Sequence, residues 1–167
     1  HRVPSLAVAP GPHGATGIPL EARVSLAEGV LRATSLQDRL APIVAIVGHG
    51  ASTVNNPYDS ALHCGACGGN TGEANARVTA MILNDPDVRD ALAGRGLEVP
   101  ADTWFVAGLH DTTTDEVTFF DETLLPAGLG PRLEQLRASF SSAGHGARAE
   151  RARRFDLPAG TDVDTAV

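Results

Sequence analysis

Lysine is absent from this sequence of 167 residues, so all 13 of its basic residues are arginine, against 20 acidic residues. The formal net charge of −7 argues against nucleic-acid binding, which depends on clustered basic side chains that neutralise phosphates. Long apolar runs are also lacking. The longest uninterrupted one, Ile43 to Val47, is far too short to span a bilayer as a helix.

Cysteine is scarce as well, with Cys64 and Cys67 only three positions apart. A disulfide across so short a loop would add little stability to the fold, so we expect reduced thiols in a cytoplasmic setting. The chain begins at His1 rather than at a methionine, and we expect it to be a piece of a longer protein.

What is present is typical of a globular protein, with 43% apolar and 20% charged residues. Prolines and glycines crowd residues 1–19, which predicts an irregular arm. Residues 20–155 carry regular hydrophobic patterns and should form one domain. Residues 156–167 are expected to be a tail.

Helices and strands alternate in the predicted domain, which indicates an α/β fold with a largely parallel sheet flanked by helices. Ile43 to Val47 and Trp104 to Leu109 are apolar without alternation, as in strands covered on both faces. Helices are expected at 20–34, from Asp85-Pro86 to Gly94 or Gly96, and at 133–155 with interruptions at Gly144 and Gly146. A further helix is expected to start at Thr71, with Asn70 as its cap and Glu73 as the partner of the cap. Its apolar face would consist of Ala74, Val78, Met81 and Ile82. An edge strand is expected at 116–120.

The first candidate for chemistry is His49, between Gly48 and Gly50 and directly after the most buried predicted strand. Ligands of open α/β sheets bind beyond the carboxyl ends of the strands. Glycine neighbours carry no side-chain bulk and would allow a metal ion to approach the imidazole. The alternative is a turn histidine that hydrogen-bonds a carbonyl group.

Cys64-Gly65-Ala66-Cys67-Gly68-Gly69 supplies two thiols ahead of the helix predicted from Thr71. A helix N-terminus lowers the pKa of a thiol, and thiolate and imidazole are usual ligands of zinc. A closed structural zinc site needs four ligands, however, and no second Cys-x-x-Cys or His-x-x-x-His pair occurs. A thioredoxin-like redox pair and two thiols without a function therefore stay open as alternatives.

Two further polar groups accompany these residues. His63 is interpreted as a loop histidine or as support for a ligand. His110 and Asp111 follow the second apolar strand, where they could orient a ligand or relay protons. The alternative for them is a hydroxyl-rich turn in which the aspartate caps the backbone.

Taken together, these motifs resemble the later half of proteins of the DabA family, a probable inorganic carbon transporter subunit. The resemblance covers most of residues 20–155. It implies a peripheral protein on the cytoplasmic face of the membrane, with a zinc site like that of β-carbonic anhydrases and a DabB-like membrane subunit as partner. The pair would hydrate CO2 to bicarbonate, coupled to a cation gradient. The motifs that carry the resemblance are Gly48-His49-Gly50, Asn55-Asn56-Pro57, Cys64 to Gly69, Asn84-Asp85-Pro86 and Trp104-Phe105 leading into His110 to Glu116.

The resemblance also implies a ligand set. The family holds Zn²⁺ with a Cys and an Asp from an earlier Cys-x-Asp motif and with a later His and Cys, which correspond here to His49 and Cys64. Cys67 is not a ligand in this correspondence. No Cys-x-Asp occurs in this chain, so we expect it to carry half of a zinc site and to lack the N-terminal half of the protein. Alone, it should bind zinc poorly and should not catalyse the hydration of CO2. A structural zinc module formed by His49, Cys64 and Cys67, or a thiol redox protein, are the other hypotheses.

Overall fold

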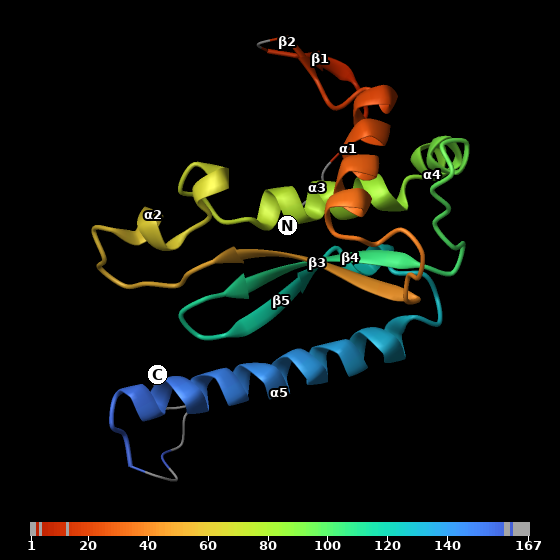
Figure 1. Cartoon of the computed structure of the whole chain (residues 1–167). Helices are drawn as coiled ribbons and strands as arrows, with labels where there is room; N and C mark the ends of the chain where they lie inside the picture. The colour runs from red at the N-terminus through yellow and green to blue at the C-terminus, as the bar shows by residue number, and fades with distance from the viewer. Residues whose placement is uncertain (1–2, 4, 13, 159–160, 162–167) are drawn as a thin grey trace.

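A three-stranded sheet forms the centre of the protein and lies between helices on both faces, as the computed structural model of residues 3, 5–12, 14–158 and 161 shows (Figure 1). Its strands are β3 (Ile43–Gly50), β4 (Trp104–Asp111) and β5 (Glu116–Phe120), in the order β3-β4-β5. The α/β class predicted from the sequence is confirmed. The likeness to the fold of β-carbonic anhydrases stays a prediction.

The expected largely parallel sheet is instead a mixed one. β3 and β4 pair in parallel over eight residues each, whereas β4 and β5 pair antiparallel. The connection between β4 and β5, residues 112–115, is too short for the crossover that a parallel pair requires. β3 also runs on to Gly50, beyond the predicted end at Val47, because Gly48, His49 and Gly50 continue the ladder with β4.

One face of the sheet is covered by α1 (Leu20–Ala33), α3 (Glu73–Asn84) and α4 (Pro86–Ala93). Their buried side chains meet those of β4 in the main core, in which Leu31, Leu83, Leu92 and Phe105 are almost fully inaccessible. Burial of each such side chain contributes about 1.5–3 kcal/mol.

The other face is covered by α5 (Gly130–Arg154), which crosses beneath the sheet in Figure 1. Leu133 packs there with Val106 of β4 and Phe119 of β5. The predicted interruptions of this helix at Gly144 and Gly146 are wrong, because α5 is continuous. Gly144 lies instead against the β4–β5 turn, where a Cβ atom would collide with the carbonyl oxygen of Asp115.

The start of α3 differs from the prediction. The residue preceding the helix is Gly72 rather than Asn70, and no side chain caps it. Asn70 donates instead to the carbonyl of Cys67, and Glu73 pairs with Arg77 one turn on. The predicted apolar face is confirmed at Ile82, which is buried, and at Val78, which packs partly buried against the core. It is wrong at Ala74, which is exposed, and it missed the buried Ala76, Ala80 and Leu83.

The start of α4 confirms the prediction made from Asp85-Pro86. The carboxylate of Asp85 accepts hydrogen bonds from the backbone N–H groups of Asp87 and Val88, and Pro86 occupies the first turn. Such a cap is worth about 1 kcal/mol. The helix ends at Gly94, as expected.

Shorter elements complete the chain. β1 (Ala9–Gly11) and β2 (Gly14–Thr16) form a hairpin within the segment expected to be an irregular arm, and it projects away from the sheet (Figure 1). The loop after β3 contains α2 (Asp59–Leu62) and the 3-10 helix η1 (Gly65–Cys67), and η2 (Glu122–Leu124) follows β5.

The division into an arm, a domain of residues 20–155 and a tail stays a prediction. Residues 159–160 and 162–167 of the expected tail lie outside the described residues. Within the part of the chain that the structure describes, none of the helices has the length and apolar character needed to cross a membrane.

Candidate metal-binding site

The carboxyl ends of β3 and β4 lie side by side and bring two histidines together. His49 pairs with His110 in the parallel register, and Gly50 pairs with Asp111. Residues directly paired in a parallel ladder point to the same face of the sheet. The two candidate positions that the sequence placed at separate strand ends therefore belong to one location.

The glycines beside His49 serve a purpose other than the one expected. A Cβ atom on Gly48 would come 2.5 Å from the carbonyl oxygen of Gly72, so the backbone of the α3 start fills the space. The N–H of Gly72 also donates to the carbonyl of His49 at 2.8 Å. Gly48 thus allows two backbone segments to pack closely, a requirement that the sequence did not reveal.

The imidazole of His49 is exposed and makes no hydrogen bond within the described part of the chain. This differs from the alternative in which a turn histidine bonds a carbonyl group. Both ring nitrogens are accordingly available to a ligand, and an imidazole nitrogen is a common donor to zinc.

Cys64 is held by a small loop that closes on itself. Its N–H donates to the carbonyl of Asn70 at 3.1 Å, and its own carbonyl accepts from Cys67 and Gly69 at 3.0 and 3.1 Å. Gly68 and Gly69 have φ angles of 66° and 81°, which permit this tight return. Both cysteines are free thiols and half-buried on this loop.

The two thiols differ in acidity because they contact each other. A hydrogen bond from Cys67, aided by backbone N–H groups of the loop and opposed by burial, lowers the pKa of Cys64. The same contact, together with burial, raises the pKa of Cys67. Cys64 is therefore the thiol that ionises first. The cause is its neighbour and the loop rather than the helix N-terminus invoked from the sequence.

The candidate residues line one hollow of ≈ 630 Å³ along β3. These residues are His49, Cys64, Cys67 and His110. Among the residues that the structure describes, no three His, Cys, Asp or Glu side chains are grouped closely enough to hold a metal ion. One imidazole and one thiol suit zinc in chemical type and supply two of the four ligands of a usual site. His49 and Cys64 as ligands stay a prediction, and the other ligands would come from outside these residues.

His63 is already engaged on both sides of its ring. Nδ1 accepts from the N–H of Ala51 at 3.2 Å, which leaves the proton on Nε2 to be donated to Asp59 at 3.1 Å. Asp59 in turn accepts from the hydroxyl of Thr53. The interpretation of His63 as a loop histidine agrees with these bonds, whereas nothing in the sequence singled out Asp59 as its partner.

Asp111 is bound into the β4–β5 turn. Its carboxylate accepts from the N–H and hydroxyl of Thr113, at 2.9 and 2.6 Å, and from the N–H groups of Ser52 and Thr114. Burial acts to raise the pKa of Asp111, but hydrogen bonds led by those from Ser52 and Thr113 outweigh it and lower the pKa to about 2. Asp111 is thus a capping aspartate of a hydroxyl-rich turn, the alternative noted from the sequence.

The side chain of His110 is partly exposed. Its Nε2 lies 3.3 Å from Asp115, whose carboxylate is also bound by Arg151 of α5. A carboxylate held in this way fixes the orientation of the ring. The proposed role of His110 as a residue that orients a ligand or relays protons stays a prediction.

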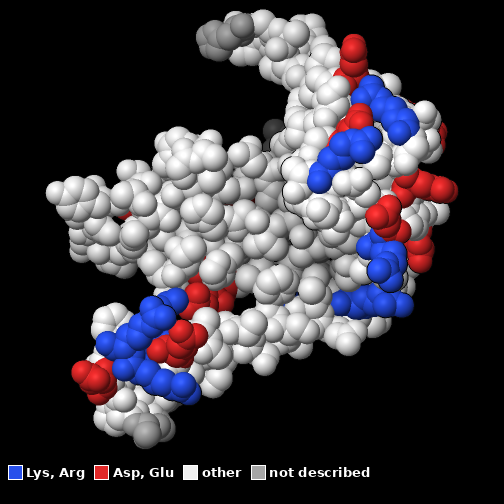
Figure 2. All heavy atoms as spheres, in the orientation of Figure 1, with Lys and Arg blue, Asp and Glu red and all other residues white. Residues whose placement is uncertain are grey.

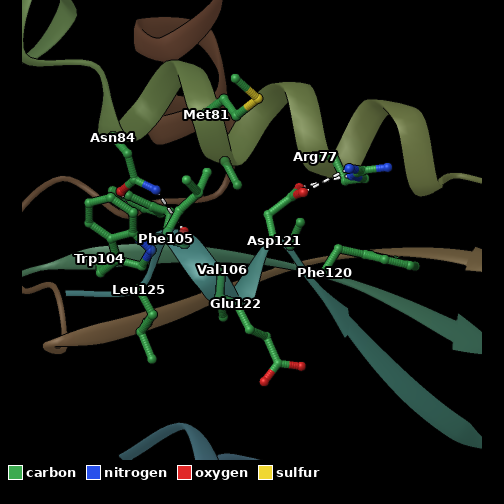
Figure 3. Close-up of a pocket in the computed structure, with 13 residues that line it drawn as sticks. Arg77, Met81, Asn84, Trp104, Phe105, Val106, Phe120, Asp121, Glu122 and Leu125 are labelled. Carbon is green, nitrogen blue, oxygen red and sulfur yellow. Dashed lines mark hydrogen bonds and ion pairs between the residues drawn. The ribbon is translucent and has the colours of Figure 1, made fainter. Parts of the chain in front are cut away.

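At the opposite end of the sheet lies an ion pair that the sequence did not predict. Arg77 of α3 donates to both carboxylate oxygens of Asp121, at 2.8 and 2.7 Å, and both side chains are nearly buried (Figure 3). The pair borders a cavity of ≈ 20 Å³, enough for about one water molecule. This location is therefore a packing feature rather than a substrate site.

Asn84 strengthens the same region. Its side-chain amide donates to the carbonyl of Phe105 at 2.7 Å and accepts from the N–H of Phe105 at 2.9 Å, so it pairs with β4 as a neighbouring strand would (Figure 3). Arg89 also donates to the amide oxygen of Asn84. The motif Asn84-Asp85-Pro86 thus joins α3, α4 and the sheet.

Comparison with known proteins identifies the family to which the chain belongs. The family model described as "Probable inorganic carbon transporter subunit DabA" matches residues 2–167. A protein of that name from Roseiflexus sp. (strain RS-1) is 54% identical over 152 residues, 91% of this chain and 18% of the relative. A relative from Bradyrhizobium sp. (strain BTAi1) is 51% identical over 162 residues, 96% of this chain and 19% of the relative. One from Methylobacterium sp. (strain 4-46) is 60% identical over 136 residues, 81% of this chain and 17% of the relative.

The chain spans about a fifth of the length of these relatives. No solved structure gives a significant match. The resemblance noticed in the motifs is confirmed over nearly the whole sequence: this chain belongs to the DabA family of probable inorganic carbon transporter subunits.

Proposed function

We propose that this chain contributes His49 and Cys64 to a zinc site of an inorganic carbon transporter subunit, and that the complete site hydrates CO2 to bicarbonate. The observation that carries the proposal is that the free imidazole of His49 and the more acidic thiol of Cys64 line one hollow at the end of β3. Relatives that match 91% and 96% of the chain are named as probable inorganic carbon transporter subunits.

Each residue has a distinct part in the proposed site. His49 would donate an imidazole nitrogen, and Cys64 would donate a thiolate fixed in place by its closed loop. His110, oriented by Asp115, would accept or deliver a proton at the same hollow. A zinc ion bound there would supply the Lewis acidity that activates water near neutral pH.

Activity requires more than this chain. Two further ligands, the DabB-like membrane subunit and the coupling to a cation gradient lie outside residues 1–167 and belong to the proposal for the full-length protein. The proposal also includes a peripheral position on the cytoplasmic face of the membrane.

The zinc content of full-length variants tests the site. Cys64→Ser should abolish stoichiometric zinc, whereas the matched Cys67→Ser, three residues away on the same loop, should largely spare it. His49→Ala should lower zinc as Cys64→Ser does. Equal loss from both cysteine substitutions would refute the assignment and favour a structural module that uses both thiols.

A thiol redox pair is the second candidate, because Cys64 and Cys67 contact each other directly. It requires a full-length protein without zinc, in which the two thiols form a disulfide that reductant reverses. Mass measurement of alkylated protein, before and after reduction, distinguishes this outcome from the zinc site.

A further inference from the structure

β3 occupies the edge of the sheet although its sequence is that of an interior strand. The order β3-β4-β5 leaves one side of β3 without a neighbouring strand among the described residues. None of residues 43–49 is buried, whereas four consecutive residues of β4, from Phe105 to Gly108, are. An apolar strand without alternation is expected to be covered on both faces and paired on both sides.

The backbone groups that face the open edge follow from the hydrogen bonds at the two ends of β3. The carbonyls of Pro42 and Gly50 accept from Trp104 and Thr112, so even-numbered residues direct their bonds toward β4. The carbonyl of His49 points the other way and accepts from Gly72. By the alternation of a strand, Ile43, Ala45 and Val47 present their N–H and C=O groups to the open edge.

In the part of the chain that the structure describes, this edge lacks the usual protection against pairing. Exposed edges in native proteins carry lysine, proline, charged inward-facing residues or bulges that prevent association. Residues 43–50 contain no charged residue and no proline, and their ladder with β4 is continuous over eight pairs. Within the described residues, no hydrogen bond from another segment reaches the backbone of Ile43, Ala45 or Val47.

The hollow of ≈ 630 Å³ follows the same edge, because residues 45–49 of β3 form one of its walls. Val30, Thr34 and Leu36 line it from α1 and the residues just after, and the remaining wall comes mainly from α3 and the cysteine loop. No residue that lines it is charged. Charged side chains in Figure 2 gather instead over α1 and α4 and at the end of α5. A strand added to β3 would lie within this uncharged hollow.

We propose that the edge of β3 over residues 43–47 pairs with an apolar β-strand from the part of the full-length protein outside residues 1–167. About four-fifths of the length of the relatives lies outside the matched region, on the same polypeptide and hence at high effective concentration. A second copy of the chain would instead have to offset the entropy of association. The added ladder ends before His49, whose carbonyl Gly72 already occupies. This pairing does not depend on a bound metal ion.

Hydrogen exchange at single-residue resolution in the full-length protein tests the pairing. The amides of Ala45 and Val47 face the open edge, and those of Val44 and Ile46 face β4 and serve as internal controls. Paired on both sides, all four amides should exchange at rates within about tenfold of one another. Exchange of Ala45 and Val47 at least a hundredfold faster than Val44 and Ile46 would overturn the proposal.

A photo-reactive residue at Val47 of the full-length protein identifies the occupant. A cross-link within one polypeptide to a segment outside residues 1–167 supports the proposal. Cross-linking between two copies, seen as a doubled mass, overturns it, as does the absence of any cross-link beyond residues 1–167. Neither readout involves zinc, so failure of the metal site leaves this test unaffected.

Discussion

Two glycines of α5 should respond in opposite directions to the same substitution. Gly144 is buried against the β4–β5 turn, and a Cβ atom there would come closer to the carbonyl oxygen of Asp115 than real Cβ atoms do. Gly146 is exposed, with nothing within 4 Å of an added Cβ atom. Both lie within a continuous helix, so alanine gains about 0.5–1 kcal/mol of helix propensity at either position.

At Gly144 the collision outweighs that gain. Overpacking typically costs about 1–3 kcal/mol, and the obstacle is a backbone carbonyl rather than a flexible side chain. Gly144→Ala should therefore destabilise the contact between α5 and the sheet by about 1–2 kcal/mol. Gly146→Ala should stabilise α5 by about 0.5–1 kcal/mol.

Native-state hydrogen exchange of α5 in the full-length protein measures these free energies locally. The predicted difference between the two variants is about 1.5–3 kcal/mol, or roughly a 13- to 160-fold difference in amide protection. Equal protection in the two variants would show that α5 does not lie against the turn at Gly144, and would refute the packing described here.

Two other residues give predictions of stability. The pKa of Asp111, about 2 in the folded chain, lies below its ordinary value of 3.8. Asp111 therefore stabilises the turn above pH ~4, by on the order of 1–2 kcal/mol after screening by solvent, and this is lost as the pH falls toward 2. Protection of the β4–β5 turn amides should show this pH dependence, and Asp111→Asn should abolish it. Arg77→Met should destabilise α3 and β5 by about 3–5 kcal/mol, because it leaves Asp121 buried without its partner. The double variant with Asp121→Asn should recover part of this loss in the same exchange assay.

Local patterns predicted much of the fold. The apolar runs from Ile43 and Trp104 marked both parallel strands, and Asp85-Pro86 marked the start of α4, because these signals act within a few residues. The errors arose where distant segments decide the structure. Gly144 continues a helix because it meets Asp115, and Gly72 replaces Asn70 ahead of α3 because it must pack against Gly48.

The candidate site was predictable to a similar degree. His49 and His110 were recognised by their position after apolar strands, and the parallel register then brought them together. Cys64 was paired with His49 through the family resemblance, since the spacing of the cysteines left a redox pair and thiols without a function open as alternatives. The Arg77–Asp121 pair spans 44 positions and has no local signature, so only the fold reveals it.

The close packing of Gly48 on Gly72 has a consequence for how relatives of this protein can diverge. The contact joins the end of β3 to the start of α3, and the intervening loop carries Cys64. A side chain at either position would separate the two backbones and move the loop as a unit. The placement of the loop relative to the sheet therefore depends on both glycines, and the two are expected to be inherited together.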